Sequence, residues 1–435
     1  MTRGRRSASL VAALSLMTAA LVAGSSTTGG TAPLTPAVNV QTIVSGLPDV
    51  PPGGVFAGVG PYGIIFDRSN HLLVSDAANS GFYSFGPGGS TAPTPLTTGN
   101  VQTGLAFAKN GDLFAALYLA GNIDQIDPAT GAFIRQLNPP SSTHLCATSL
   151  ATDPVTGDLF FGQPNSGGIC SGTPGITRVE NPTSASPTFV TSNPVPGDNY
   201  IGLTFARDGT LYAVQQGSDG GCAVRIRGIT SRTPPTVTEL ACFPNFENEF
   251  VGIETVALSA RPKANPTLFV AGPDGTITEI DQSTSPPTTT PLVTLGTRVD
   301  DLTIGTDGCL YATQSTGIVR ITPTNGRCRL RSVNVLTTLR IRPDATDATT
   351  GQLVTLRARL LGTGHPSGQR ITFTVTGANP ATRIVRTDSS GKAALTYRGT
   401  HTGTDVVTAT ATVDTNALAS NPATVLWQLP VRSHT

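Results

Sequence analysis

The stretch GIIFDRSNHLLVSD, residues 63–76, joins a short β-prone run, a polar turn and a second run that begins with leucine. Five further stretches have the same order: GLAFAKNGDLFAAL (104–117), SLATDPVTGDLFFG (149–162), GLTFARDGTLYAVQ (202–215), TVALSARPKANPTLFVAG (255–272) and DLTIGTDGCLYATQ (301–314). The leucine after each turn recurs about every 40 to 57 residues, at Leu72, Leu113, Leu159, Leu211, Leu268 and Leu310. This period is typical of a four-stranded propeller blade. The six repeats therefore predict a six-bladed β-propeller.

Each repeat is followed by two further β-like runs, so that one unit supplies four strands. The first unit continues with GFYSFGP (81–87) and TPLTT (94–98), and the fourth with AVRIRGIT (223–230) and TVTELACF (236–243). Turns rich in Gly, Pro, Asn and Asp separate these runs, and no sustained helical period occurs in the sequence. Residues 39–47 (NVQTIVSGL) look like the end of a blade without its beginning. We expect them to add the outer strand to the sixth blade and so close the ring.

The chain changes character after Val335. Seven β-like runs follow in about 95 residues, which is the number and length typical of an immunoglobulin-like sandwich. The tail has no cysteine, so we expect its core to depend on packing, with these members: Leu356, Phe373, Val375, Leu395 and Trp427. The predicted fold class is therefore all-β, with a six-bladed β-propeller over residues 39–335 and a C-terminal Ig-like β-sandwich over residues 336–429.

The N-terminus has the pattern of a secretory signal peptide. Arg3, Arg5 and Arg6 precede an apolar run from about residue 10 to 23, and small residues follow at 24–26. This pattern predicts a signal peptide over residues 1–26 and a secreted, extracellular protein. The apolar run is short for a membrane span, and a retained anchor is the alternative. Charged residues make up 13% of the chain and the formal net charge is +1, so no basic field is present that would attract nucleic acid or an anionic membrane. After cleavage of the signal peptide we expect no stable membrane insertion.

All six cysteines lie within the repeat region, and a secreted context favours disulfides. If the four strands of each blade are numbered outward from the axis, the cysteines of one blade fall at neighbouring strand ends or turns. We therefore expect three bonds, each within one blade, which join Cys146 to Cys170, Cys222 to Cys242 and Cys309 to Cys328. A metal site is the alternative, but no two cysteines have the C-x-x-C spacing.

Candidate ligand-binding residues stand just before the innermost strands, where the loops of all blades converge at the axis. Aligning the repeats places at this position Tyr62, Thr103, Thr148, Ile201, Glu254 and Asp300. One residue earlier stand Pro61, Gln102, Ala147, Tyr200, Ile253 and Val299. Tyr62, Gln102 and Tyr200 are candidate ligand-binding residues, although tyrosines at a rim also serve packing.

Three carboxylates on the fifth and sixth repeats form a candidate metal site. Glu254, Asp300 and Asp301 belong to adjacent blades, and together they could hold a hard cation such as Ca²⁺. His144 precedes the innermost strand of the third repeat and is a candidate general base. In the structural alternative the acids cap turns, or Glu254 pairs with Arg298 or Arg261.

The first repeat, with P-Y-G-I-I-F-D from Pro61 and L-L-V-S-D-A-A-N-S from Leu72, resembles the NHL repeat. The six-unit layout resembles gluconolactonase-type propellers and streptogramin lyase, over about residues 39–333. The resemblance implies a metal-dependent lactonase or a lyase-like enzyme with its site in the funnel. The chain differs from these families at the positions of their metal-binding and catalytic residues. Gly58-Val59-Gly60-Pro61 replaces a turn with a metal-binding glutamate, and no histidine occurs between His144 and His365.

In the tail, residues 388–393 (DSSGKA) and 402–409 (TGTDVVTA) resemble bacterial Ig-like domains of the invasin and intimin type. With the low charge and the missing family residues, this favours a secreted, non-catalytic recognition or scaffold protein. Its propeller funnel would bind an extracellular small molecule, glycan or protein, with the Ig-like domain as spacer or adhesion module. The alternative is a metal-dependent lactonase or streptogramin-lyase-like enzyme that uses the three carboxylates, with His144 as a possible base.

Overall fold

The computed structural model describes residues 38–430, except for residues 52–57, 100–102, 119, 139–144, 164–173, 191–194, 197–198, 218–219, 232–233, 244–252, 257–266, 329, 331–336, 362–366 and 414–415. Within these residues all regular secondary structure is β-strand, and no helix is present that could cross a membrane. The predicted signal peptide lies outside the described residues.

Six small antiparallel sheets follow one another along the chain, and each corresponds to one sequence repeat. Blade one contains β2 (Pro61–Phe66), β3 (Leu72–Asp76) and β4 (Gly81–Phe85), with a single bridge from Phe82 to Thr97. Blade two contains β5 (Leu105–Phe107), β6 (Leu113–Leu117), β7 (Asn122–Ile126) and β8 (Phe133–Gln136). Blade three contains β9 (Leu150–Thr152), β10 (Leu159–Gln163), β11 (Gly175–Glu180), β12 (Thr188–Phe189) and β13 (Val195–Pro196).

The second half of the ring has the same order. Blade four contains β14 (Asn199–Phe205), β15 (Leu211–Gly217), β16 (Gly220–Arg227) and β17 (Thr236–Phe243). Blade five contains β18 (Ile253–Val256), β19 (Thr267–Ala271), β20 (Thr276–Asp281) and β21 (Thr288–Thr294). Blade six contains β22 (Leu302–Ile304), β23 (Leu310–Gln314), β24 (Gly317–Pro323) and, as its outer strand, β1 (Val38–Ser45).

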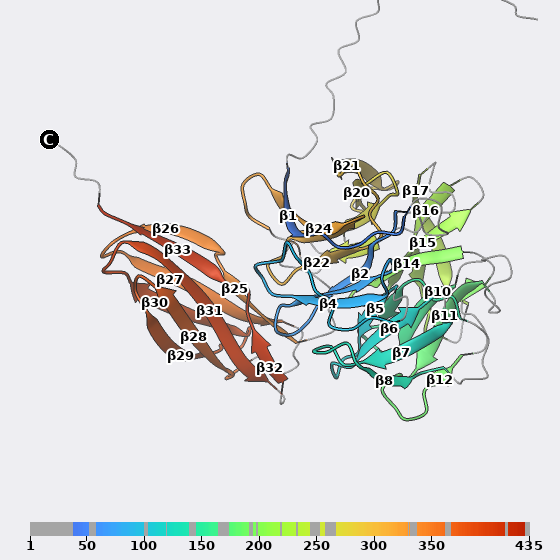
Figure 1. Ribbon diagram of the computed structural model, residues 1–435, viewed down its shortest axis with the longest axis horizontal. Helices are drawn as coiled ribbons and strands as arrows, with labels where there is room; N and C mark the ends of the chain where they lie inside the picture. The colour runs from blue at the N-terminus through green and yellow to red at the C-terminus, as the bar shows by residue number, and fades with distance from the viewer. Residues whose placement is uncertain are drawn as a thin grey trace, which may run out of the picture. The chain divides into compact units, whose positions relative to one another are not determined.

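Contacts between the innermost strands close these sheets into a ring. Each innermost strand contacts that of the next blade, in the order β2, β5, β9, β14, β18 and β22, and β22 contacts β2 again. β1 pairs antiparallel with β24, from Val38 opposite Pro323 to Ser45 opposite Gly317. The N-terminal strand thus completes the last blade, as the sequence predicted, and leaves no inner edge open. Figure 1 shows the sheets following one another around the ring.

The repeated leucine marks the first turn of every blade. All six leucines begin or nearly begin the second strand of their blade and are at most 2% exposed. The turn before each leucine is built from local polar contacts. In blade one, Asp67 Oδ1 accepts bonds from the backbone N–H groups of Ser69 and His71, and Asn70 has a φ of 65°. The motif therefore combines a side-chain-stabilised turn with a buried anchor.

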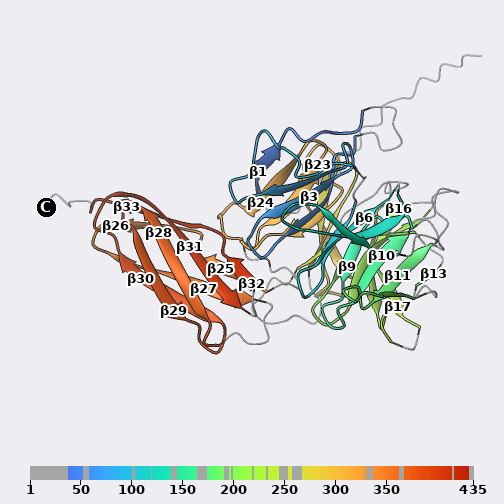
Figure 2. The same ribbon diagram turned by 60° about the horizontal axis from the view of Figure 1, so that its bottom comes forward.

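The C-terminal part forms two facing sheets. One contains β25 (Thr338–Arg342), β27 (Leu353–Leu361) and β30 (Lys392–Arg398). The other contains β26 (Ala345–Thr349), β28 (Arg370–Gly377), β29 (Ala381–Arg386), β31 (Gly403–Val413), β32 (Asn416–Ala419) and β33 (Ala423–Gln428). Figures 1 and 2 show their strands along a common direction, as in aligned sheet packing. The predicted class, an all-β chain with a six-bladed propeller followed by a β-sandwich, is confirmed.

The sandwich core contains every predicted member: Leu356, Phe373, Val375, Leu395 and Trp427. Asp405 anchors its largest residue, because Oδ2 accepts bonds from Trp427 Nε1 at 2.7 Å and from the Tyr397 hydroxyl at 3.1 Å. Gly399 leaves room for the indole, since a Cβ there would lie 2.4 Å from Trp427. The sequence did not predict β26 or β32, which are only five and four residues long.

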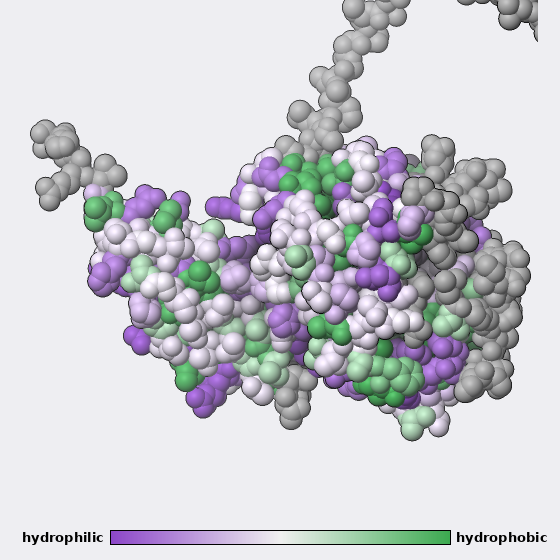
Figure 3. All heavy atoms as spheres, in the orientation of Figure 1, coloured by the Kyte–Doolittle hydropathy of each residue, from purple (hydrophilic) through white to green (hydrophobic). Residues whose placement is uncertain are grey.

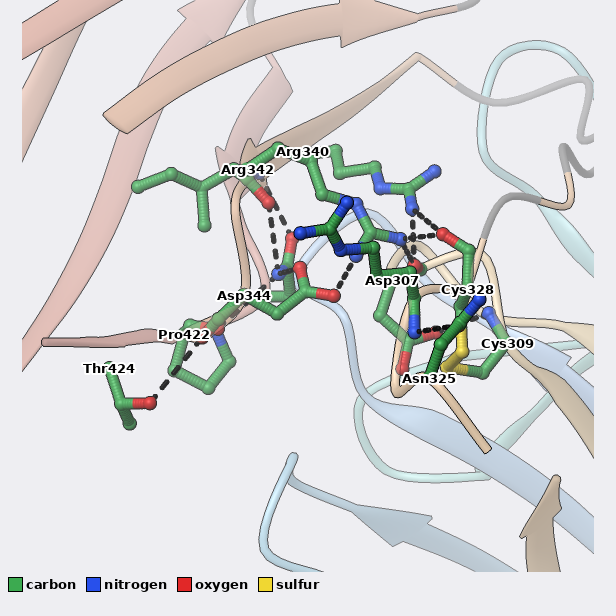
Figure 4. Close-up of polar contacts among 12 residues, drawn as sticks. Asp307, Cys309, Asn325, Cys328, Arg340, Arg342, Asp344, Pro422 and Thr424 are labelled. Carbon is green, nitrogen blue, oxygen red and sulfur yellow. Dashed lines mark hydrogen bonds and ion pairs between the residues drawn. A yellow bond between two sulfur atoms is a disulfide. The ribbon is translucent and has the colours of Figure 1, made fainter. Parts of the chain in front are cut away.

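Polar contacts surround the first turn of blade six and the segment that follows β24 (Figure 4). Arg340 and Arg342 on β25 donate to the backbone oxygens of Asp307 and Cys328. Both arginines alternate with buried residues of β25, so their side chains leave the sandwich core. The Asp307 side chain is used within the blade, where Oδ1 accepts from Cys309 N at 2.9 Å.

Candidate functional site

Polar residues gather at the propeller end where the innermost strands begin. Tyr62 lies at the start of β2, Tyr118 directly follows β6, and Asp300 and Asp301 directly precede β22. Tyr62 interacts electrostatically with Arg298, Tyr118 and both aspartates. We call Tyr62, Tyr118, Arg298, Asp300 and Asp301 the axial cluster. The alignment of the repeats had identified Tyr62 and Asp300, and Asp301 was a candidate metal ligand.

A buried ion pair forms the centre of the axial cluster. Arg298 Nε lies 2.9 and 3.0 Å from the two carboxylate oxygens of Asp300, and Nη2 lies 2.5 Å from Oδ1. The Asp300 side chain is 1% exposed and that of Arg298 is 13% exposed. The backbone N–H of Asp300 also donates to Thr313 Oγ1 at 2.9 Å. A carboxylate this buried requires its cation, so the two side chains form one unit.

Asp301 connects the sixth blade to the first. Its Oδ2 accepts a bond from Ile64 N at 2.9 Å, and its Oδ1 accepts one from Leu302 N at 2.8 Å. Burial raises the pKa of Asp301 to about 7, the backbone bonds oppose this shift, and the Asp300 charge adds to it. This carboxyl group therefore serves the closure of the ring.

Tyr62 supplies a phenol beside the ion pair. Its side chain is 6% exposed. Burial, followed by the negative charge of Asp300, raises the pKa of Tyr62 well above its usual value. The phenol therefore stays protonated at every physiological pH and can donate a hydrogen bond.

The other predicted site residues are placed as follows. Tyr200 is 1% exposed and packs with Phe160 and Leu203 in the core between blades three and four. Glu254 lies on β18, but its side chain is outside the described part of the structure. Gln102 and His144 lie outside the described residues.

Two of the three predicted disulfides are present. Cys222 and Cys242 face each other on β16 and β17, and Cys309 joins Cys328. Cys146 is also disulfide-bonded, while its predicted partner Cys170 lies outside the described residues, so that pairing stays a prediction. Among the described residues, one His/Cys/Asp/Glu group has metal-binding proximity, Cys222, Glu239 and Cys242. Because its two sulfurs are bonded to each other, they offer no thiolate ligands.

Sequence reasoning missed two buried acids of the propeller. Asp76 at the end of β3 is fully buried; its Oδ1 accepts from Ala78 N, while its Oδ2 has no hydrogen-bond partner among the described residues. Asp124 on β7 is 4% exposed, and its Oδ1 likewise has none. Burial raises the pKa of each carboxyl to about 6. LLVSD ends in an aspartate after an apolar run, whereas NIDQI mixes polar and apolar residues, so nothing in its sequence indicates that Asp124 is buried.

A scan of protein-family models and a search of curated proteins each found no match. Among solved structures, the chain is similar to a protein of unknown function from Bacteroides thetaiotaomicron, with 14% identity and a TM-score of 0.44 over 66% of this chain and 76% of that chain. It is similar to the extracellular domain of a putative hybrid two component system from the same organism, with 13% identity, a TM-score of 0.38 and 88% of this chain covered. The chain spans 59% of the length of that domain.

A third similar structure is the Dos1 propeller, with 13% identity and a TM-score of 0.38 over 60% of this chain and 77% of that chain. The assignment of the propeller rests on the strand order and the closed ring of innermost strands.

Proposed function

We propose that this chain is an exported, non-catalytic recognition protein that binds a ligand at the axial cluster. The proposal rests on the contacts that the two acidic side chains, Asp300 and Asp301, already make within the protein. Asp300 is paired with Arg298, and Asp301 accepts two backbone bonds. Acids held in this way are positioned to shape a polar surface, and their structural use leaves little freedom for general acid–base catalysis.

The same contacts argue against the calcium alternative. Both oxygens of Asp300 accept bonds from a guanidinium, whose positive charge opposes a second cation at the same place. With its pKa raised to about 7, the Asp301 carboxyl is only partly ionised at neutral pH. Calcium prefers several ionised carboxylates in a shell of six to eight oxygens. A metal-dependent lactonase would therefore require the Arg298–Asp300 pair to separate.

A neutral, hydroxyl-rich ligand such as a glycan fits the axial cluster best. Tyr62 and the Arg298–Asp300 pair are largely buried, so a ligand at the axis would contact their exposed edges, where an aromatic ring adjoins two charges that cancel. Sugars are bound by this combination of a ring face and paired polar groups. The formal net charge of +1 creates no field that would select a highly charged ligand.

Export and modular organisation complete the proposal. The arginine-then-apolar pattern of residues 1–26 and the disulfides of blades four and six support a secreted, extracellular location. The repeats support a relationship of residues 39–335 to NHL and gluconolactonase-type propellers. The motifs at 388–393 and 402–409 support an Ig-like spacer over residues 336–429.

The test is a glycan-array binding experiment with the secreted form of the protein. We expect binding that the Tyr62→Phe substitution weakens about tenfold, since the ring remains and one hydrogen bond is lost. Tyr397→Phe, in the sandwich, is the matched control and should bind normally. A turnover assay over lactones and cyclic depsipeptides runs in parallel, with added Ca²⁺. Hydrolysis that Asp301→Asn abolishes would replace this proposal with the enzyme alternative.

A further inference from the structure

A pocket of about 320 Å³ lies between blades five and six, apart from the axial cluster. Its apolar lining comes from one residue on each of five strands and from Leu330, which lies after β24. The five strand residues are Val38, Phe269, Leu292, Leu310 and Ile321. The volume is at the lower end of the range of about 300 to 1,000 Å³ that small-molecule sites occupy. Protein interiors rarely leave apolar spaces of this size between packed sheets.

The wall of this pocket is fixed covalently. The Cys309–Cys328 disulfide ties the segment after β24 to the turn before β23, and Leu330 N donates to the Gly308 oxygen at 3.0 Å. Figure 4 shows Cys309, Cys328 and Asn325 side by side at this wall. A pocket whose wall is held in this way loses little conformational entropy when a ligand enters.

One arginine gives the pocket a charge preference. Arg327 lines the pocket, is exposed, and its backbone N–H donates to Asn325 Oδ1 at 2.9 Å. Within the described residues, its guanidinium has no carboxylate in ion-pair range. Glu279 also lines the pocket, but it already interacts with another group of the protein. The guanidinium of Arg327 is therefore the charge at the rim that a ligand can use.

We propose that this pocket binds a small amphipathic carboxylate, such as a medium-chain fatty acid. The alkyl chain lies against Phe269, Leu310 and Ile321, which are buried between the two blades, and the carboxylate pairs with Arg327 at the rim. Apolar burial supplies most of the affinity, and the charge-assisted hydrogen bonds to Arg327 select the head group.

Calorimetric titration with octanoate, hexanoate, 1-octanol and octylammonium tests the proposal on the full secreted chain. We expect one octanoate per chain. Each CH₂ group contributes about fourfold in affinity, so hexanoate should bind about 15-fold more weakly. Arg327→Gln should weaken octanoate about tenfold and leave 1-octanol unchanged. The control Arg207→Gln, an exposed arginine in blade four, should change neither titration.

Other outcomes overturn the proposal. If the unsubstituted protein does not bind octanoate, the proposed binding site does not exist. If octylammonium binds more tightly than octanoate, Glu279 rather than Arg327 binds the charged head group. If Arg327→Gln and the unsubstituted protein bind octanoate with equal affinity, Arg327 does not bind the carboxylate and the proposed selection of an acidic head group is wrong. Leu292→Gln, at a partly exposed wall position, should weaken octanoate and octanol alike. Tyr62→Phe should leave all four titrations unchanged, which separates this site from the glycan proposal.

Discussion

Replacing Asp124 by Asn should stabilise the propeller at pH 8 and leave it unchanged near pH 4. Asp124 is paired across the strands with Ala115 and lies two residues from Ile126. Both neighbours belong to the apolar cluster that joins blade two to Leu73 and Phe82 of blade one. Because alternate residues of a strand share a face, the carboxyl group points into this interface. Its burial there raises its pKa to about 6.

The magnitude follows from the shift. A rise from 3.8 to about 6 is about two pKa units, and each unit corresponds to about 1.4 kcal/mol. The folded state binds this proton more tightly than the unfolded state. The contribution of the protonated Asp124 carboxyl group to folding stability is therefore fully present below pH 3.8. It is lost as the pH rises through about 6. Above pH 7 the folded propeller bears a cost of about 3 kcal/mol, which the neutral amide removes.

Differential scanning calorimetry from pH 4 to 8 measures the effect. The chain has one tryptophan, Trp427 in the sandwich, so its fluorescence reports sandwich unfolding separately. We expect the propeller transition of Asp124→Asn to rise by about 5 to 10 °C at pH 8, with no change at pH 4. Asp208→Asn, on an exposed turn of blade four, is the control. A gain of the same size at both pH values would refute the reasoning, because it could not come from proton binding.

Three further substitutions test the packing described above. Arg298→Gln leaves Asp300 buried without its cation and should destabilise the propeller by about 3 to 5 kcal/mol, seen as a lower calorimetric transition. Asp405→Ala removes the acceptor of Trp427 and should cost the sandwich about 2 to 4 kcal/mol; unchanged denaturation by tryptophan fluorescence would contradict this. Leu113→Ala, at a blade anchor with no exposed surface, should cost about 2 to 5 kcal/mol in the propeller transition alone.

The architecture could be predicted from sequence because its determinants are local and repeated. Each blade places its leucine directly after a polar turn, and all six leucines are buried as the motif requires. The pairing of β1 with β24 was predictable for the same reason, since residues 39–47 matched the end of a repeat whose beginning was missing.

The burial of Asp76 and Asp124 could not be predicted, because the alternation of polar and apolar residues along a strand does not show which side chains are buried in a propeller. A blade packs against neighbours on both faces, so both sides of its middle strands are apolar. In NIDQI (122–126), Asp124 occupies the blade one interface, while Ile123 on the opposite side belongs to the cluster with blade three. The sequence pattern would assign Asp124 to solvent, and only the ring of blades removes that possibility.

The pairing at the axial cluster depended on loop geometry. The structural alternative drawn from sequence paired Glu254 with Arg298 or Arg261, and this stays a prediction because the Glu254 side chain is outside the described part of the structure. The structure shows Arg298 paired with Asp300, two residues further along. Two side chains at positions i and i+2 meet when both project to the same side of an extended segment. Val299 between them is fully buried in the cluster between blades five and six. The apolar residue therefore fixes the direction in which both charged neighbours point.

Blade six brings the two proposed sites into one sheet. Asp300 and Asp301 precede β22 at one end, whereas Cys309 and the pocket wall follow the turn at its other end. The three residues of β22 span about 10 Å, so the sites open on opposite faces of the propeller and cannot share a ligand. Leu302, Ile304 and Leu310 pack in one cluster with Phe269 and Ile321 of the pocket. Because the Cys309–Cys328 disulfide fixes the pocket wall, octanoate should enter without moving the backbone that positions Asp301 and should leave glycan affinity unchanged. A change in glycan affinity on adding octanoate would contradict the preformed pocket.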